Sequence, residues 1–252
     1  MVEADAFKRT PIERAVDGLT AFSGGCAMNR ILMVAAPLML LMTLAGCGST
    51  TVLLANFNAE PLGGPPAFAQ PTGTVETRSG AGSVLVANPP GSSTKWAQIS
   101  HPTQPSPQTM LRARFDSFHG TGKYGLLVAV FIPSGTGAVT LQLEPFAGTI
   151  DSSPEFLHLD FMPENNVRIN DNNADRFGTF PRDQSFVVSI QVDTTASPPK
   201  ATISLLGGSG ASGSRDVTLP SLATQFGAVR LWMGFQWTGS FFFDDLLVTR
   251  SN

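Results

Sequence analysis

The chain has 252 residues, of which 42% are hydrophobic and 14% are charged, whereas soluble domains typically contain about 25% charged residues. Its 16 basic and 19 acidic residues give a formal charge of −3. This charge is too balanced for a protein that grips a phosphate backbone, so we expect no nucleic-acid partner. The 25 glycines and 19 prolines disfavour long helices and favour short segments between turns.

The first predicted element is a secretory signal. The apolar run 31–46 (ILMVAAPLMLLMTLAG) follows directly after Arg30, and it is shorter than the roughly 20 residues that span a bilayer. A basic residue, a short apolar run and then small residues are typical of a cleaved export signal. Counted from Met28, the signal covers residues 28–46. Residues 1–27 are then either a misassigned start or an unusually long n-region of the signal.

The tetrapeptide LAGC at 44–47 resembles the lipobox of bacterial lipoproteins. This resemblance implies cleavage directly before Cys47, a diacylglyceryl group on its thiol and an acylated new amino terminus. Two or three acyl chains anchor a protein stably to a membrane. Residues 48 and 49 are Gly and Ser rather than Asp, which in Gram-negative lipoproteins implies the outer membrane. We therefore expect a lipid-anchored envelope protein; the alternatives are an ordinary buried helix or a single membrane anchor.

Residues 47–252 are predicted to form one all-β domain. Cys26 lies upstream of the cleavage point, so this domain has no disulfide. Segments rich in β-branched and aromatic residues alternate with turn-type clusters, and no window shows a sustained helical period. About a dozen antiparallel strands without helices predict a jelly-roll sandwich. In chain order, the predicted strands are 51–57, 83–88, 95–100, 109–115, 124–132, 138–144, 156–161, 166–170, 185–192, 200–206, 228–235 and 241–249.

Two of these strands indicate their position. Residues 124–132 (YGLLVAVFI) are apolar on both faces, which predicts a central strand, whereas 185–192 alternates as expected for a sheet with one solvated face. The segments LLANF (53–57) and FFFDDLLVTR (241–250) resemble the first and last strands of concanavalin A-like, laminin G-like sandwiches. The resemblance implies that the two ends of the domain pair in one sheet. A generic jelly roll is the competing interpretation.

Two strands carry the candidate ligand-binding residues. His158 and Asp160 share one face of strand 156–161, either as a solvent-facing polar stripe or as the wall of a concave pocket. Arg230, Trp232 and Gln236 share a face of the strand that begins near residue 228. Together they suit a sugar ring or a peptide group, which they would bind by stacking and forked hydrogen bonds.

The leading hypothesis is a non-catalytic envelope protein that binds a glycan or a protein partner. No complete catalytic set is present, and strand parity places Glu155 and Asp160 on opposite faces, which disfavours a retaining glycosidase. Two alternatives remain open. One is a carbohydrate-active enzyme that uses His158 and Asp160, with Glu164 as a third group, and the other is a purely structural envelope lipoprotein.

No metal or other cofactor is predicted, with calcium as the alternative. Asp171, Asn173 and Asp175 place oxygen ligands at alternate positions, as in the first half of a calcium loop. Arg176 and Arg182 stand where such a loop needs Gly and a bidentate Glu. Clusters of this kind also form hairpin turns. The pair at 244–245 (Asp-Asp) is a separate calcium candidate.

Overall fold

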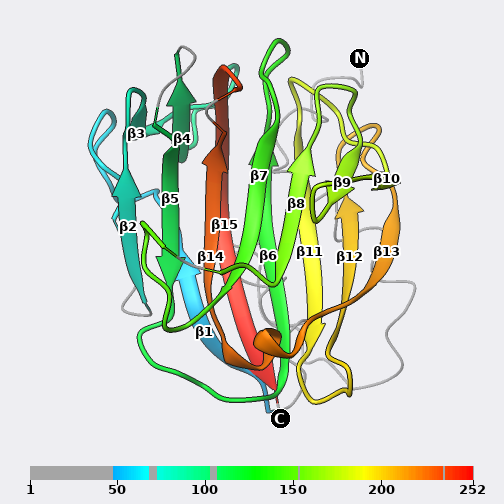
Figure 1. Ribbon diagram of the computed structural model, residues 1–252. Helices are drawn as coiled ribbons and strands as arrows, with labels where there is room; N and C mark the ends of the chain where they lie inside the picture. Colours follow the sequence, from blue (N-terminus) through cyan, green and yellow to red (C-terminus); the bar gives the residue numbers. More distant parts are fainter. Residues whose placement is uncertain (1–47, 68–72, 103–106, 153, 235, 252) are drawn as a thin grey trace, which may run out of the picture.

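The chain folds into two antiparallel β-sheets that face each other (Figure 1). In the described part of the chain, no helix is long and apolar enough to span a membrane. The predicted signal and Cys47 lie outside the described residues, so the lipobox stays a prediction. The computed structural model describes residues 48–67, 73–102, 107–152, 154–234 and 236–251.

The back sheet in Figure 1 has eight strands in the order β13-β12-β11-β6-β15-β4-β3, with β1 also paired to β15. The long β15 joins β4 through its first half and β1 through its second half. The strands are β1 (Thr50–Ala55), β3 (Ser83–Ala87), β4 (Trp96–His101), β6 (Lys123–Phe131), β11 (Ser185–Asp193), β12 (Lys200–Leu206), β13 (Ser214–Thr218) and β15 (Gly239–Ser251).

The front sheet has seven strands in the order β10-β9-β8-β7-β14-β5-β2. A short 3-10 helix, η2 (Ser221–Gln225), leads into β14. The strands are β2 (Thr74–Arg78), β5 (Thr109–Arg114), β7 (Val139–Pro145), β8 (Leu157–Phe161), β9 (Val167–Ile169), β10 (Asn172–Phe177) and β14 (Phe226–Met233).

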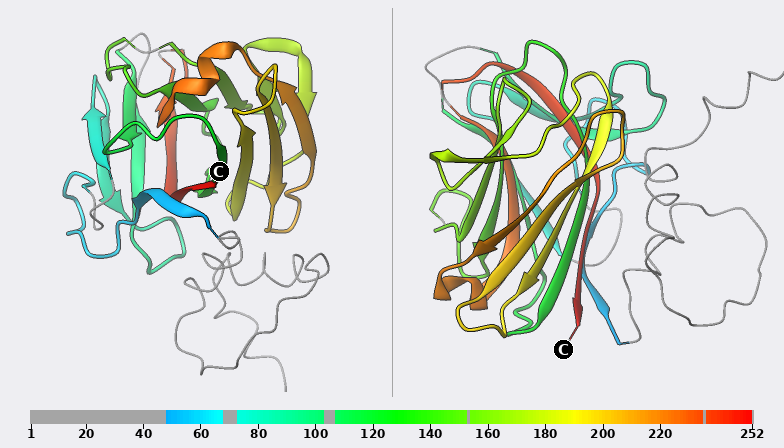
Figure 2. Two further views of the ribbon diagram at one scale, coloured as in Figure 1. Left: turned by 90° about the horizontal axis from the view of Figure 1, so that it is seen from below. Right: turned by 90° about the vertical axis from the view of Figure 1, so that its right-hand side faces the viewer.

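The pairing confirms two sequence predictions. β6 lies between β11 and β15, as its apolar faces indicate. β1 pairs with β15, with Thr50 opposite Arg250, so the two ends of the described domain lie side by side at one end of the sandwich (Figure 2). The all-β sandwich follows from the alternation of apolar residues along most strands, which gives each sheet one face to bury against the other.

The core between the sheets is rich in phenylalanine. Phe115 and Phe226 meet edge to face at a centroid distance of 5.0 Å, and Phe161 and Phe180 do so at 5.5 Å. These rings are fully buried or nearly so. The aromatic core gives a domain without disulfides a large apolar area to bury on folding.

A β-bulge interrupts β15 between Asp244 and Leu247, where the register with β6 shifts. Asp245 has a φ of 50°, and the side chains of Phe243 and Leu246 on either side enter the core. The bulge leaves the Asp244 carboxyl buried at 4% exposure, where the backbone N–H of Phe57 donates to it at 3.4 Å. Simple strand alternation does not predict this arrangement because a bulge inserts an extra residue.

Candidate functional site

Strand register gathers most of the predicted ligand-binding residues on one surface. We call this surface the outer face: the side of the seven-stranded sheet that points away from the eight-stranded sheet. In β8, β7 and β14 the leucines at 159, 141 and 231 point into the core, so their neighbours in sequence point outward. Two rows cross the sheet there: Arg230, Gln142 and His158 form one row, and Trp232, Thr140 and Asp160 form the next.

His158 and Asp160 form a buried pair in the middle of this surface. The His158 Nε2 atom lies 2.8 Å from Asp160 Oδ1, and its Nδ1 atom lies 3.5 Å from Glu155 Oε1. Burial lowers the pKa of His158, but the hydrogen bonds with Asp160 and Glu155 and the charges of Asp160 and Asp171 outweigh it and raise the pKa to about 9. The imidazole is therefore protonated at neutral pH.

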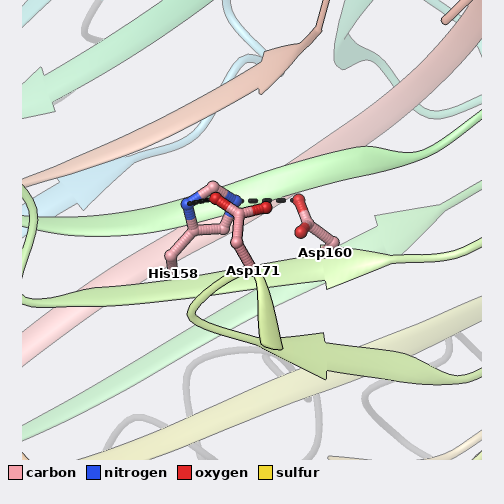
Figure 3. A group of neighbouring side chains, drawn as sticks. All are labelled: His158, Asp160 and Asp171. Atoms are coloured by element: carbon pink, nitrogen blue, oxygen red, sulfur yellow. Dashed lines mark hydrogen bonds and ion pairs between the residues drawn. The ribbon is translucent and has the colours of Figure 1, made fainter. Parts of the chain in front are cut away.

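Asp160 is held ionised by several donors. The Thr140 hydroxyl donates to Oδ1 at 2.6 Å, and the Arg168 guanidinium donates to Oδ2 through Nη2 at 2.7 Å. Burial raises the pKa of Asp160, yet the hydrogen bonds from His158, Thr140 and Arg168 and the His158 charge bring it below its usual value. Arg168 also donates to Asp171 Oδ1 at 2.8 Å, which ties the turn after β9 to this pair. Figure 3 shows Asp171 beside His158, with its Oδ2 atom 3.8 Å from His158 Nδ1.

A second ionic group lies beside the first on the outer face. Arg112 donates from Nε to Glu144 Oε2 at 2.7 Å, and both side chains are fully buried. Arg230 lies on the other side of the same carboxylate, with Nε 2.6 Å from Oε1. The exposed end of the group is Glu76, which accepts from Arg112 Nη1 at 3.2 Å. Two arginines thus share one buried carboxylate.

The loop between β7 and β8 runs across the outer face (Figure 1). Arg230 on β14 donates from Nη2 to the Thr149 carbonyl at 2.9 Å, and Arg78 on β2 forms an ion pair with Asp151 at 2.8 Å. These contacts hold the loop against β14 and β2, beyond the two strands that it connects.

His158 is only 5% exposed, so the solvent-facing stripe considered from the sequence is wrong. Glu155, Asp171 and Trp232 lie against the imidazole, and strand alternation alone does not reveal such neighbours.

An accessible rim borders the buried groups. The side chains of Glu155, Asp171 and Arg168 are 42%, 65% and 17% exposed. Trp232 is partly exposed, and its ring meets that of His158 edge to face at 6.1 Å. In the described part of the chain its indole Nε1 is buried without a hydrogen-bond partner. Charged hydrogen-bonding groups and an aromatic ring therefore lie together at the surface.

Two predicted residues lie apart from this rim. Gln236 is exposed in the turn after β14, which ends at Met233, so strand alternation does not place it beside Trp232. Glu164 forms an ion pair with Arg176 at 3.8 Å and is 59% exposed.

Of the predicted ligand-binding set, the structure brings together His158, Asp160, Arg230 and Trp232. Arg168 and Arg112 were missed, because their importance arises from pairing across strands.

The sequence-predicted calcium ligands already have arginine partners. Asp171 and Asn173 both accept from Arg168, and Asp175 forms an ion pair with Arg215 on β13 at 2.8 Å. Asp171 instead joins His158 and Asp160 in a set whose ligand atoms lie within 4.8 Å of one another.

The residues at this set fit a metal ion poorly. A protonated imidazole has no lone pair for a cation, and the single Arg168 guanidinium already forms ion pairs with both carboxylates. As arranged, the set is better suited to hydrogen bonding than to metal coordination.

The carboxylates near His158 do not form an acid–base pair. Glu155 precedes β8, so strand parity does not apply to it, and the expectation that it faces away from Asp160 is wrong: its carboxylate reaches the same imidazole. The hydrogen bond with His158 lowers the pKa of Glu155 below its usual value in spite of partial burial. Glycoside hydrolysis needs one carboxylic acid with a raised pKa. Neither Glu155 nor Asp160 meets this requirement.

A scan against protein-family models and a search of curated proteins find no match. Among solved structures, lectin II from Ulex europaeus is similar over 81% of this chain and 100% of its own, with a TM-score of 0.52 and 10% identity. The lectin UEA-II complexed with galactose covers 81% of this chain and 98% of its own, with a TM-score of 0.51 and 10% identity. The VIP36 exoplasmic/lumenal domain in its Ca2+-bound form covers 80% and 90%, with a TM-score of 0.48 and 8% identity. The similarities to lectin II and to the lectin UEA-II, with TM-scores of 0.52 and 0.51, confirm the predicted concanavalin A-like sandwich fold.

Proposed function

We propose that this chain is a lipid-anchored cell-envelope protein whose β-sandwich binds carbohydrate without chemical conversion. The observation that carries the binding proposal is the rim of Glu155, Arg168, Asp171 and Trp232 around the buried His158–Asp160 pair. Sugars present apolar ring faces and many hydroxyls, which suit an aromatic side chain flanked by charged donors and acceptors.

The rigidity of the rim supports binding. Arg168 is fixed by Asp160 and Asp171 at 2.7 and 2.8 Å, and the Trp232 ring rests against the buried His158 ring. Side chains that are already ordered lose little conformational entropy when a ligand arrives. The fold supports the choice of ligand, since the solved proteins that share it include lectins, one of them complexed with galactose.

The non-catalytic part of the proposal rests on the charge states. The two carboxyls that form hydrogen bonds with His158, those of Glu155 and Asp160, have lowered pKa values, so both are ionised at neutral pH. A glycosidase mechanism would need one of them protonated.

The anchor part rests on the LAGC motif that ends at Cys47 and on the apolar run before it. Mass spectrometry of the chain purified from bacterial membranes tests it. We expect a mature amino terminus at Cys47 that carries a diacylglyceryl thioether and an acyl chain. A free thiol with residues 28–46 still attached would contradict the anchor.

A panel of envelope and plant glycans, incubated with the full chain, tests binding and catalysis together. We expect one or more glycans to raise the melting temperature while no sugar is released. Release of sugar that disappears in Asp160→Ala would favour the enzyme alternative. Absence of any thermal shift, together with capture of an envelope protein at the same rim, would favour a protein partner instead.

A further inference from the structure

The two chain ends of the described domain lie at the end of the sandwich that an anchor at Cys47 would hold closest to the membrane. Only Gly48 and Ser49 separate Cys47 from Thr50, the first residue of β1. Because an extended chain spans at most about 3.6 Å per residue, Thr50 would lie within roughly 11 Å of the anchored residue. The end of the sandwich that contains Thr50 must then face the bilayer.

The loop between β5 and β6 belongs to this same end. Thr50 pairs with Arg250 in the β1–β15 ladder, and Arg250 donates from Nη2 to the Thr121 carbonyl of the loop at 2.6 Å. The loop runs past the chain ends at the bottom of the view in Figure 1. The start of β1 and the β5–β6 loop are therefore neighbours.

This loop presents Phe118 to solvent. The Phe118 side chain is 52% exposed, although its ring lies 6.1 Å from that of Phe146. Among the residues that the structure describes, the one other exposed large apolar side chain is Leu62, at 56%.

Leu62 lies towards the opposite end of the sandwich. Its neighbour Gly63 donates to the Val86 carbonyl, and Val86 is aligned through Ala97 and Phe243 with Val130, near the far end of β6. Val130 lies seven positions after Lys123 in β6, which corresponds to about 23 Å along the strand.

We propose that the β5–β6 loop docks on the lipid surface and that Phe118 enters the interfacial region of the bilayer. This inference rests on the proposed anchor at Cys47. The short tether between Cys47 and β1 limits how far this end can move from the membrane, and an exposed aromatic side chain gains from leaving water for the lipid interface.

The contact is apolar rather than electrostatic. The loop residues 115–122 (FDSFHGTG) contain no lysine or arginine, and Lys123 at the start of β6 pairs with Asp193 at 3.9 Å. A cluster of basic side chains would bind anionic lipids, but the described loop residues 115–122 carry none. We therefore expect docking to be the same on zwitterionic and anionic membranes.

Fluorescence quenching by lipids tests the proposal. The full chain, processed in a bacterial host, is reconstituted in phosphatidylcholine vesicles with and without phosphatidylglycerol. In the processed chain the Cys47 thiol is consumed by lipid and Cys26 has been removed, so Ser117→Cys supplies the single thiol for a bimane label. Ser209→Cys labels the loop after β12 at the far end of the sandwich.

We expect nitroxide lipids to quench most of the fluorescence at position 117 and little at 209, equally in both vesicle types. Adding Phe118→Ser should restore most of the emission at 117, whereas the matched control Leu62→Ser should leave it quenched. Equal quenching at both labels, or no effect of Phe118→Ser, would overturn the docking while co-flotation with vesicles still supports the anchor. Failure of the wild-type chain to float with vesicles would overturn both proposals.

Discussion

Arg112 and Glu144 form an ion pair without exposed side-chain surface, with 2.7 Å between Nε and Oε2. The same carboxylate faces Arg230, whose Nε lies 2.6 Å from Oε1. Glu144 is thus the one negative charge between two guanidinium groups at this point of the outer face. Loss of one partner from a buried ion pair leaves an uncompensated charge in a medium of low polarity.

Glu144→Gln should lower the free energy of unfolding by about 3–5 kcal/mol, since Arg230 loses this counter-charge and Arg112 keeps only the partly exposed Glu76. Urea denaturation at pH 7 measures this loss. The control is Asp151→Asn, which breaks the exposed pair with Arg78 (35% and 74% exposed) and should cost at most about 1 kcal/mol. Equal costs for the two variants would contradict the view that the Glu144 group stabilises the sheet.

The folded chain should lose stability at alkaline pH because His158 loses its proton there. Its pKa in the folded chain is about 9 rather than 6.5, so folding favours the protonated ring. The stabilising contribution is complete below pH 6.5 and is lost as the pH rises through 9. This rise in the pKa of His158 corresponds to about 3 kcal/mol in the free energy of unfolding.

Urea denaturation between pH 6 and pH 9.5 tests this dependence, and NMR titration of the ring gives the pKa directly. The pKa values of the facing groups Glu155 and Asp160 are lowered, so both remain ionised across this range. Measurement in an Asp244→Asn background removes the contribution of the Asp244 carboxyl, whose pKa is about 8, and the remaining change is assigned to the imidazole. In that background, His158→Gln should flatten the pH profile. A wild-type profile that stays flat, or a ring that titrates near pH 6.5, would count against the buried ion pair.

Ionisation of the buried Asp244 carboxyl should lower the stability of the fold as the pH rises. Burial and the neighbouring Asp245 raise the pKa of Asp244 to about 8, so the folded chain favours its neutral form. The native state then holds one more proton than the unfolded state between pH 4 and pH 8, and stability falls across that window. Asp244→Asn removes the charge but keeps an oxygen that can accept the Phe57 N–H.

The variant should therefore be more stable than wild type at pH 8, by up to about 5 kcal/mol for one proton held across this window, and nearly equal to it at pH 4. Thermal unfolding at the two pH values provides the comparison. A variant that is less stable than wild type at pH 8 would show that the ionised carboxylate is needed, for instance by a cation.

Twelve of the strands could be predicted from the sequence because their apolar residues point to the core. The three that were missed, β2, β10 and β13, are edge strands with mostly polar, exposed residues. In such strands the hydrogen bonds with one neighbour, rather than burial, determine the extended conformation. Sequence periodicity reports burial, so it does not detect them.

The site was predictable only in part. Alternation placed His158 with Asp160 and Arg230 with Trp232, but not the register that joins the two pairs through β7. Glu155 was assigned to the wrong face because the strand begins at Leu157. Arg168 and Arg112 gave no signal of their own, since an ion pair across strands depends on which strands are neighbours.

The most direct test of the account is the affinity of the outer face for a glycan found by the panel, measured by isothermal titration calorimetry. We expect Trp232→Ala to weaken binding at least about tenfold, or about 1.4 kcal/mol, without a matching loss of melting temperature, and Trp232→Phe to retain most of the affinity because a stacking ring remains. Unchanged affinity in Trp232→Ala would contradict the proposal that carbohydrate binds at this rim.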